Sequence, residues 1–569
     1  MAFLRLPVPG GSAVPDMRLC LGWQLARLLI MLVLTGGTLP GFAVAAGAHE
    51  LSAREQADGR LAHVLARGRL IVGIKADYPP WGMLDAAGNI VGLEADLAQN
   101  LARRLGVGLE LVAVSTANRQ QRLAQGQVDM LIATLGDTTE RRAISDLIQP
   151  HYYASGVRLL AHDDLPFSDW GELRGRPVCL TEGSYYNRML SERYLITPVT
   201  FVGTRDTQLA LRGGRCVGWA YDDTVLAQVV TEPGWEEYKT GLPTILQIEW
   251  AIAVRQGEGE RSLGRFVSDT VVDWHRSGYL LERQQRWGLA DHDYLRQQHA
   301  LWIKTDADGQ LVCQRQVDGD FPPDCLAGVL RANAVDVAAL PPWIARLKDT
   351  TGLDLSALFD RYHRSRLLTG IGLTLAISVV SIIGSLVVGV LFAVIENRFH
   401  QARGMLRWCV HAPARVLVAC ARMTPPILQL YIVFFGLSGL LASHIGISLS
   451  SFVVASLVFS VYAGASNAAV LAPALARRER AAPGTPLPAL IANAVEQTFE
   501  SMVSIMVNIV KAAGMASVIA LPEVISSVNA IISEGGDAGS LMTLLLLFYF
   551  SFVLLVMALL NVLKRWVSQ

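Results

Sequence analysis

The sequence predicts two structural classes in one chain: an α/β region with a mostly parallel sheet, then an all-α region that crosses a membrane. Between residues 50 and 290, short apolar runs typical of buried strands alternate with helical runs. Mean hydropathy is +0.35, only 17% of residues are charged, and the apolar excess is concentrated after residue 366. Net charge is zero and there is no basic stripe, so we expect no nucleic-acid partner.

Residues 1–46 are interpreted as a cleaved signal peptide, with Met17 a candidate start. Arg18 and Arg27 precede an apolar run that is short for a membrane span, and Ala43-Val44-Ala45 is typical of a cleavage site. The alternative is a permanent membrane anchor. With a signal peptide, the chain that follows is expected to lie outside the cytoplasm.

The α/β region begins with a first lobe whose strands end in polar or aromatic turns. Predicted strands and helices alternate, and parallel sheets bind ligands at the carboxyl ends of their strands. Tyr78, Trp81, Arg119 and the turn from Thr134 to Arg141 follow such ends, so we expect them to converge. The predicted strands are Leu70–Ile74, Leu109–Val114 and Val128–Ala133, and the helices are Glu50–Arg67, Val91–Leu105 and Asn118–Gln125.

The turn Thr134-Leu-Gly-Asp-Thr-Thr-Glu-Arg-Arg142 favours carboxylate binding. Hydroxyl and amide groups at a strand end donate hydrogen bonds, and Arg141 offers a planar guanidinium that binds a carboxylate bidentately. Taken alone, the same pattern also fits an ordinary strand-to-helix turn with exposed arginines. The sequence on either side of this turn distinguishes a carboxylate site from an ordinary turn.

A second lobe, at about residues 162–246, repeats the α/β pattern. Val178–Thr181 and Cys216–Tyr221 are predicted strands, and the turn Glu182–Tyr186 offers amide groups at a helix start. The chain crosses between the lobes near Val157–Ala161 and again near Trp250–Val254. Two crossings predict a hinge about which the lobes close on a ligand.

Residues 50–290 resemble the periplasmic amino-acid-binding proteins of ABC importers for polar amino acids. The residues that carry the resemblance are GIKADYPPW, GNIVGLEADLAQNLARRLGV, VDMLIATLGDTTERR, PHYY and GRCVGWAYDD. The resemblance implies the two-lobed type II periplasmic binding protein fold. It also implies that Arg141 holds the ligand α-carboxylate and that Asp222 holds the α-ammonium. The other residues that it places at the ligand are Tyr78 and Trp81, which pack on it, and Thr134, Gly136, Thr138, Ser184 and Tyr185 in the hydrogen-bonding turns.

Lys75 bears on the choice of ligand. Many family members have an aspartate there, whereas the glutamate/aspartate-binding members have a basic residue and a pair like Asn118-Arg119. Two cations beyond Arg141 suit a second carboxylate and repel a cationic side chain. The alternatives are that another polar amino acid is the ligand, or that Lys75 and Arg119 are either solvated or paired with Asp77 and Glu94.

The cysteines predict two bridges in an exported region. Cys179 and Cys216 lie on two strands of the second lobe, where the alternative is a pair of buried thiols. Cys313 and Cys325 would close a short loop within residues 291–365, which we interpret as a small ordered linker. None of the cysteines has zinc-site spacing, and we expect no metal or other cofactor.

Residues 366–569 predict about five transmembrane helices. Basic residues after the first, third and fifth spans place those ends in the cytoplasm. Lys511, within the fourth span, is expected either at an interior face or at the interface. The predicted spans are Leu367–Ile395, Val416–Leu441, Leu449–Ala476, Ser501–Val528 and Leu541–Leu563.

This half resembles the permease subunits of the same importers. The residues that carry the resemblance are Thr369–Leu375, RMTPPILQLYIVFFGL and KAAGMASVIALPEV. The family's Glu-Ala-Ala…Gly loop, which docks on the ATPase, is not kept here, which leaves Leu487–Glu500 as a candidate docking helix.

The leading hypothesis is therefore an amino-acid importer that fuses binding protein and permease in one chain of a bacterial inner membrane. It implies a free amino acid as ligand, a lipid bilayer, a separate cytoplasmic ABC ATPase and a homodimer. A ligand-gated channel is disfavoured because all spans follow both lobes and TVGYG is absent. A membrane-bound amino-acid sensor stays open, and an enzyme is not expected.

Overall fold

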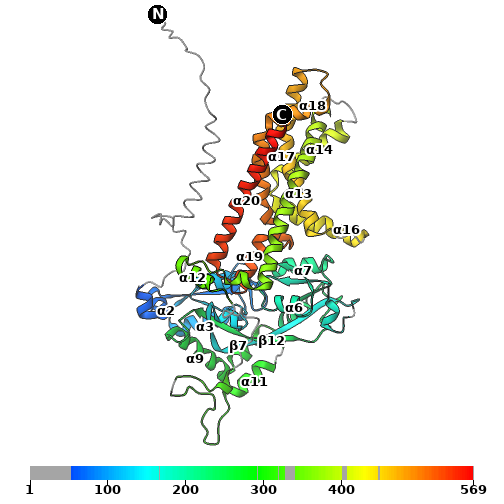
Figure 1. Cartoon of the computed structure of the whole chain (residues 1–569). Helices are drawn as coiled ribbons and strands as arrows, with labels where there is room; N and C mark the ends of the chain where they lie inside the picture. Colours follow the sequence, from blue (N-terminus) through cyan, green and yellow to red (C-terminus); the bar gives the residue numbers. More distant parts are fainter. Residues whose placement is uncertain are drawn as a thin grey trace, which may run out of the picture. The chain divides into compact units, whose positions relative to one another are not determined.

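The computed structural model describes most of the chain after the amino terminus (Figure 1). The predicted signal peptide and its candidate start lie outside the described residues, and so does Cys20. The described ranges are 53–165, 167–290, 293–317, 319–326, 340–399, 407–445 and 449–567.

A nine-stranded sheet in the order β5-β1-β6-β12-β7-β10-β8-β9, with β11 (Tyr238–Lys239) paired to β7, runs through both lobes. In the first lobe, β1 (Arg69–Lys75) pairs in parallel with β5 (Gly108–Val114) and β6 (Met130–Leu131). The apolar side chains of β1 are almost all buried, which explains its continuous apolar run. Helices α2 (Ala53–Arg67), α3 (Leu93–Leu105) and α4 (Arg119–Ala124) occupy the predicted helical segments.

The second lobe has its own parallel strands. β8 (Pro177–Thr181) pairs with both β9 (Thr197–Phe201) and β10 (Gly218–Asp222). The strand β9 was not predicted, because Pro198 and flanking threonines give it a weak apolar signal. Helices α6 (Asn187–Arg193), α7 (Thr204–Arg212) and α8 (Asp223–Val229) complete the lobe.

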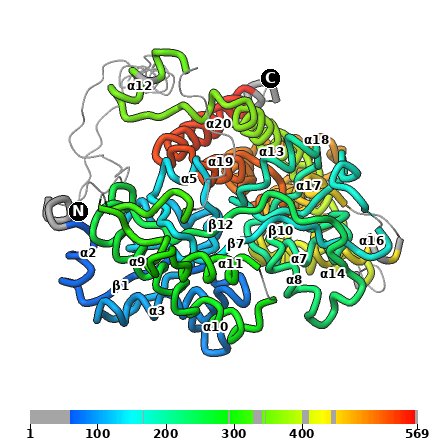
Figure 2. The backbone as a smooth tube through the Cα atoms, turned by 90° about the horizontal axis from the view of Figure 1, so that it is seen from below, coloured from blue at the N-terminus to red at the C-terminus, as the bar shows by residue number. Residues whose placement is uncertain are grey.

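Two long strands, β7 (Ser145–His162) and β12 (Ile245–Arg255), join the lobes as an antiparallel pair (Figure 2). The first half of β7 lies in the first lobe. Its residues 157–160 pair with β10 of the second lobe. The register shifts twice in β12, and Leu246 has φ of 53°. The crossings thus lie a few residues before the predicted ones. Two α/β lobes joined in this way form the type II periplasmic binding protein fold.

Residues 293–326 belong structurally to the first lobe and are not only a linker. Helix α11 (Asp293–Trp302) places Trp302 in a buried cluster with Val272, Cys313, Phe321 and Cys325. Val272 lies on α9 (Ser262–Ser277), and Arg276 of the same helix donates to Trp302 O at 3.3 Å. The predicted linker is therefore shorter, and it includes α12 (Pro342–Thr351).

Both predicted disulfides, Cys179–Cys216 and Cys313–Cys325, are formed, whereas Cys409 and Cys420 are free and exposed. The bridges close loops of 37 and 12 residues. By loop entropy they stabilise the fold by about 4 and about 3 kcal/mol. We expect Cys179→Ala/Cys216→Ala to lower the unfolding temperature more than Cys313→Ala/Cys325→Ala, as measured by thermal unfolding of the full chain. The reverse order would contradict the loop-entropy argument.

The carboxyl-terminal region is helical, with four described helices long and apolar enough to cross a membrane. A bent pair, Cys409–Met423 and Pro426–Leu441, turns by 115° at the proline pair and makes a fifth span if counted as one. The four helices are α13 (Arg361–Phe399), α17 (Ser451–Ala481), α18 (Leu487–Ala512), which continues into the 3-10 turn Ala513–Ile519, and α20 (Ala538–Val567).

Three expectations for this region need correction. The predicted fourth span, Ser501–Val528, is divided: α18 and its 3-10 extension end at Ile519, and α19 (Val524–Ser533) is a separate helix. The candidate docking segment Leu487–Glu500 is the first half of the continuous α18 and forms no short helix of its own. Lys511 is exposed, so the structure does not bring it to an interior face.

Small residues let α13 and α17 approach closely. A Cβ atom on Gly389 would meet Asn467 Cβ at 2.7 Å, and one on Gly464 would meet Val388 Cγ1 at 2.6 Å. Asn467 is fully buried and donates to Ser385 O at 3.3 Å. This helix pair is therefore tightly packed.

The second lobe makes several polar contacts to the helical region. Arg215, next to the bridged Cys216, donates to Phe434 O and Leu449 O, each at 2.6 Å. These carbonyls lie at the π-helical turn Ile432–Leu437 and just before α17. Tyr431 Oη donates to Asp206 at 3.2 Å, and Arg188 pairs with Asp360 at 2.9 Å.

Candidate ligand site between the lobes

The predicted site residues meet where β1, β6 and β10 end. Tyr78, just after β1, donates its hydroxyl proton to Asp222 at the end of β10, so this hydrogen bond joins the two lobes. Both side chains are buried, and the Tyr78 and Tyr221 ring centroids are 5.4 Å apart. The cleft is thus closed in this structure.

Lys75 is the last residue of β1, and only 2% of it is exposed. Its Nζ donates to Tyr221 Oη at 3.3 Å and lies 3.5 Å from the centroid of the Tyr78 ring. Burial lowers the pKa of Lys75 to about 8. The charges of Asp77, Asp222 and Glu94 act on Lys75, but among the described residues none of these carboxylates forms an ion pair with it, so the ammonium group can still bind an anion.

Arg141 connects the lobes from the other side of the cleft. Its Nη1 donates to Gly136 O at 2.8 Å, and its Nη2 donates to Gly183 O of the second lobe at 3.2 Å. Thr138 fixes the arginine locally, because its Oγ1 caps helix α5 (Thr139–Arg142) by accepting from Arg141 N at 3.3 Å. Burial, and next the charge of Arg119, lower the pKa of Arg141 to about 9.

Gly136 and Tyr185 shape the space around this guanidinium. A Cβ on Gly136 would lie 2.9 Å from Ile248 Cδ1 and 3.3 Å from Arg141 Nη1, so only glycine leaves the room that the guanidinium occupies. The Arg141 guanidinium carbon lies 5.9 Å from the Tyr185 ring centroid. Ser184 is buried, and its amide donates to Thr181 O at 3.3 Å.

Arg119 lies at the start of α4 and donates to the carbonyls of Ala133 and Thr134, the latter at 3.1 Å. It is 3% exposed. Thr134 has φ of 48°, which turns its amide toward Glu94, and the Thr134 N to Glu94 Oε1 distance is 2.6 Å. Both Arg119 and Thr134 therefore lie at the cleft.

Glu94 and Tyr152 are site residues that the sequence reasoning missed. Tyr152 Oη donates to Glu94 Oε1, and burial raises the pKa of Glu94 to about 7. Glu94 stands one residue inside α3, where its pattern is that of an ordinary first-turn acid. A buried, apolar-flanked acid directly opposite Thr134 is visible only in three dimensions.

Trp81 packs within an aromatic cluster at the hinge. Its ring centroid lies 4.3 Å from that of Tyr153 and 4.9 Å from that of Trp250. Its Nε1 is buried and has no hydrogen-bond partner among the described residues. Trp81 thus lies near the site, and its indole N–H is available to donate a hydrogen bond.

The electrostatics of the closed cleft are unbalanced toward positive charge. Among the described residues, Lys75, Arg119 and Arg141 form no ion pair with a carboxylate. Burial raises the pKa of Asp222 to about 6, while the Tyr78 hydrogen bond and the charge of Lys75 oppose that rise. Glu94 Oε2 and Tyr186 Oη are buried without a partner in the described structure. The site therefore has hydrogen-bonding and charge capacity that its own side chains leave unused.

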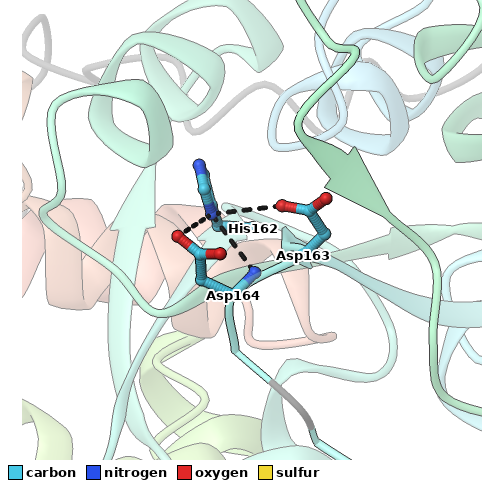
Figure 3. Close-up of side chains that lie close together, drawn as sticks. All are labelled: His162, Asp163 and Asp164. Atoms are coloured by element: carbon cyan, nitrogen blue, oxygen red, sulfur yellow. Dashed lines mark hydrogen bonds and ion pairs between the residues drawn. The ribbon is translucent and has the colours of Figure 1, made fainter.

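A second group of titratable side chains lies elsewhere on the second lobe (Figure 3). His162 Nδ1 lies 3.5 Å from Asp163 Oδ1 and 3.3 Å from Asp164 Oδ2, and its Nε2 lies 3.4 Å from Glu237. Both aspartates are exposed. Solvated ion pairs account for this arrangement.

Comparisons with known proteins concern the α/β region. The profile of the bacterial extracellular solute-binding proteins, family 3, matches residues 70–290. The L-cystine-binding protein TcyJ of Escherichia coli K12 is 26% identical over 271 residues, which cover 47% of this chain and 97% of that protein. The probable arginine-binding protein ArtJ of Chlamydia trachomatis is 23% identical over 230 residues, or 39% of this chain and 86% of that protein.

Among solved structures, holo ArgBP from T. maritima is 26% identical, with a TM-score of 0.36, and covers 40% of this chain and 99% of its own. Residues 70–290 of this chain are accordingly a solute-binding domain of bacterial extracellular family 3, with amino-acid-binding relatives.

Proposed function

We propose that this chain binds a free acidic amino acid outside the cytoplasm and passes it through a membrane domain of the same polypeptide. The observation that carries the proposal is a set of three buried cations that face Asp222 across the hinge and form no ion pair with a carboxylate among the described residues: Lys75, Arg119 and Arg141. An ionised group buried without a partner is costly, so such a set indicates a missing anionic ligand.

In the proposed complex the α-carboxylate lies on Arg141 and the α-ammonium on Asp222. The Tyr78 ring packs on the ligand, and the spare oxygen of Glu94 accepts a further ammonium hydrogen bond. Lys75 and Arg119 are left for a side-chain carboxylate. Relatives are named for binding L-cystine or arginine. The cation at Lys75 disfavours the guanidinium of arginine in this chain.

Calorimetry on the full chain in lipid nanodiscs tests this ligand assignment. The titrants are L-glutamate, L-aspartate, L-glutamine, L-cystine and L-arginine. We expect glutamate or aspartate to bind at least tenfold more tightly than the others. Saturable binding of arginine with no response to the acidic amino acids would refute the assignment, and preferential binding of cystine would replace it.

The membrane part of the proposal rests on the helical region. Its helices are long enough to span a bilayer, and α13 and α17 are closely packed. We propose that this region is a permease domain in a bacterial inner membrane and that residues 1–46 are a signal peptide. Two copies of the chain would form a homodimer, and a separate cytoplasmic ATPase would bind to it. Tethering keeps each binding domain at an effective concentration of about the mM range at its permease.

A specific observation favours a second candidate, an amino-acid sensor without transport. Helices α17 and α18 are joined only through Ala482–Pro486, and no separate helix lies between them for an ATPase to dock on. Co-purification of an ATPase with the chain, and ATP-dependent uptake of glutamate by proteoliposomes containing both, would establish the importer. Ligand binding without either result would establish the sensor.

Ligand affinity is expected to depend on pH because of Asp222. Its pKa is raised to about 6 in the unliganded cleft, and binding an ammonium group favours the ionised carboxylate. Binding therefore releases a proton below about pH 6, and affinity rises as pH increases from 5 to 7. Tyr78→Phe removes the hydrogen bond that lowers this pKa, so it should move the midpoint to higher pH. Calorimetry across this range checks both, and a pH-independent affinity would contradict the role of Asp222.

A further inference from the structure

A cavity of about 520 Å³ lies beside the cleft, on the side of the helical region. This volume is within the ~300–1,000 Å³ typical of small-molecule sites. Its walls come from α5, from the turn that starts at Gly183, from α12, from the start of α13 and from the connection between α19 and α20. The charged lining residues and the histidine are Glu140, Arg141, Arg188, Lys348, Asp354, His363 and Glu534.

Arg141 and Tyr185 line both the cavity and the cleft. The guanidinium of Arg141, held between Gly136 O and Gly183 O, therefore forms part of the wall between the two spaces. The cavity therefore begins directly behind the guanidinium of Arg141 as seen from the cleft. Glu140 precedes Arg141 directly, so the short helix α5 places Glu140 at the cavity and Arg141 at the wall between the cavity and the cleft.

Two groups at the cavity have unused acceptor capacity. Both carboxylate oxygens of Glu140 are buried without a hydrogen-bond partner among the described residues, although the side chain lines the cavity. His363 is 5% exposed, its Nε2 lies 2.9 Å from Glu534 Oε2, and its Nδ1 is buried without a partner in the described structure. When Nε2 donates its proton to Glu534, Nδ1 is an acceptor. Buried acceptors left unsatisfied in this way cost free energy that a donor would recover.

The other charged groups at the cavity already have partners of opposite sign. Lys348 pairs with Asp354 at 2.8 Å, Arg188 with Asp360 at 2.9 Å and Glu534 with His363. Glu140 is thus the spare anion among the described lining residues. Lys348 and Arg188 still present positive charge at the same wall, which suits the carboxylate end of a zwitterion.

We propose that this cavity is a second, weaker binding site for a free amino acid, with Glu140 and His363 as acceptors for its ammonium group. The site rests on the proposed function, because its occupant is the amino acid that the cleft releases. It lies between the binding lobes and the helical region, where a substrate in transfer needs to be held. The cleft and the cavity are separated by Arg141 and can be occupied together.

Equilibrium binding of radiolabelled L-glutamate to the full chain in nanodiscs tests the proposal. The wild type is expected to bind two equivalents with different affinities. Glu140→Gln should bind one equivalent, with the tighter affinity unchanged within about threefold. Glu260→Gln, the same change at an exposed glutamate outside this cavity, should keep both. Ala143→Phe, which adds a ring from an exposed position in the cavity wall, should also leave one equivalent.

Different outcomes separate this proposal from the one on which it rests. One equivalent in the wild type, or two equivalents in Glu140→Gln, would overturn the second site and leave the cleft assignment standing. No binding by the wild type would overturn both the acidic-ligand assignment and the second site. Loss of the tighter equivalent in Glu140→Gln would overturn the separation of the two sites.

Discussion

Arg141→Ala is expected to abolish detectable amino-acid binding, lowering affinity by at least ~100-fold, or about 3 kcal/mol. The guanidinium is buried and fixed by two carbonyls, one from each lobe. Its removal takes away the proposed carboxylate contact and also one of the links that hold the closed lobes together. Calorimetry on the full chain with the best ligand of the panel measures the loss.

Two matched variants interpret that result. Arg142→Ala changes the next residue, whose side chain pairs with Asp137 at 2.5 Å outside the cleft, and it should retain affinity within a few fold. Arg141→Lys keeps the charge but not the planar fork, so it should recover only part of the affinity. Equal losses in Arg141→Ala and Arg142→Ala would show a general effect on α5 and would count against the carboxylate role.

Lys75→Glu should reverse the charge preference of the site. The change adds an acid to a position on which the charges of Asp77, Asp222 and Glu94 already act, so an acidic ligand loses its partner and meets repulsion. We expect affinity for glutamate to fall by at least ~100-fold, and arginine or lysine to bind better than glutamate. The measurement is the same calorimetric panel, read as the ratio of glutamate to arginine affinity.

Lys75→Met is the control for size, because methionine keeps most of the length of lysine without charge. It should weaken glutamate binding and leave glutamine binding nearly unchanged. If Lys75→Glu still preferred glutamate over arginine, the ammonium group of Lys75 would not determine which ligand side chain is bound. The acidic-ligand assignment would then rest on Arg119 alone.

The family resemblance predicted Arg141, Asp222, Tyr78 and Lys75 at one ligand, and the strand pattern agrees, because each of them lies at the end of a strand or beyond it. Within each lobe the carboxyl ends of parallel strands lie at one edge of the sheet, so the strand order indicates which residues border the cleft. Glu94 was not predicted as a cleft residue because it lies on the helix α3 and not at a strand end. Its position in the cleft depends on hydrogen bonds with Thr134 and Tyr152, which are 40 and 58 residues away in the sequence. Long-range hydrogen bonds of this kind leave no periodic signal in the sequence.

The region after residue 290 was harder to predict for a similar reason. Trp302 and Phe321 have the spacing of isolated apolar residues in a linker, and only their packing with Val272 on α9 shows that they extend the first lobe. In the helical region, hydropathy located the long apolar helices but not the break at Ile519. Backbone geometry there depends on tertiary contacts such as Val524 N to Thr374 Oγ1 at 3.1 Å.

The polar contacts of Arg188, Asp206 and Arg215 with the helical region have a mechanical consequence. All three residues belong to the second lobe, so these contacts tether that lobe to the helical region. We therefore expect opening of the cleft to move the first lobe more than the second, and the α11 extension to move with the first lobe. Ligand binding would then bring the first lobe onto a tethered second lobe.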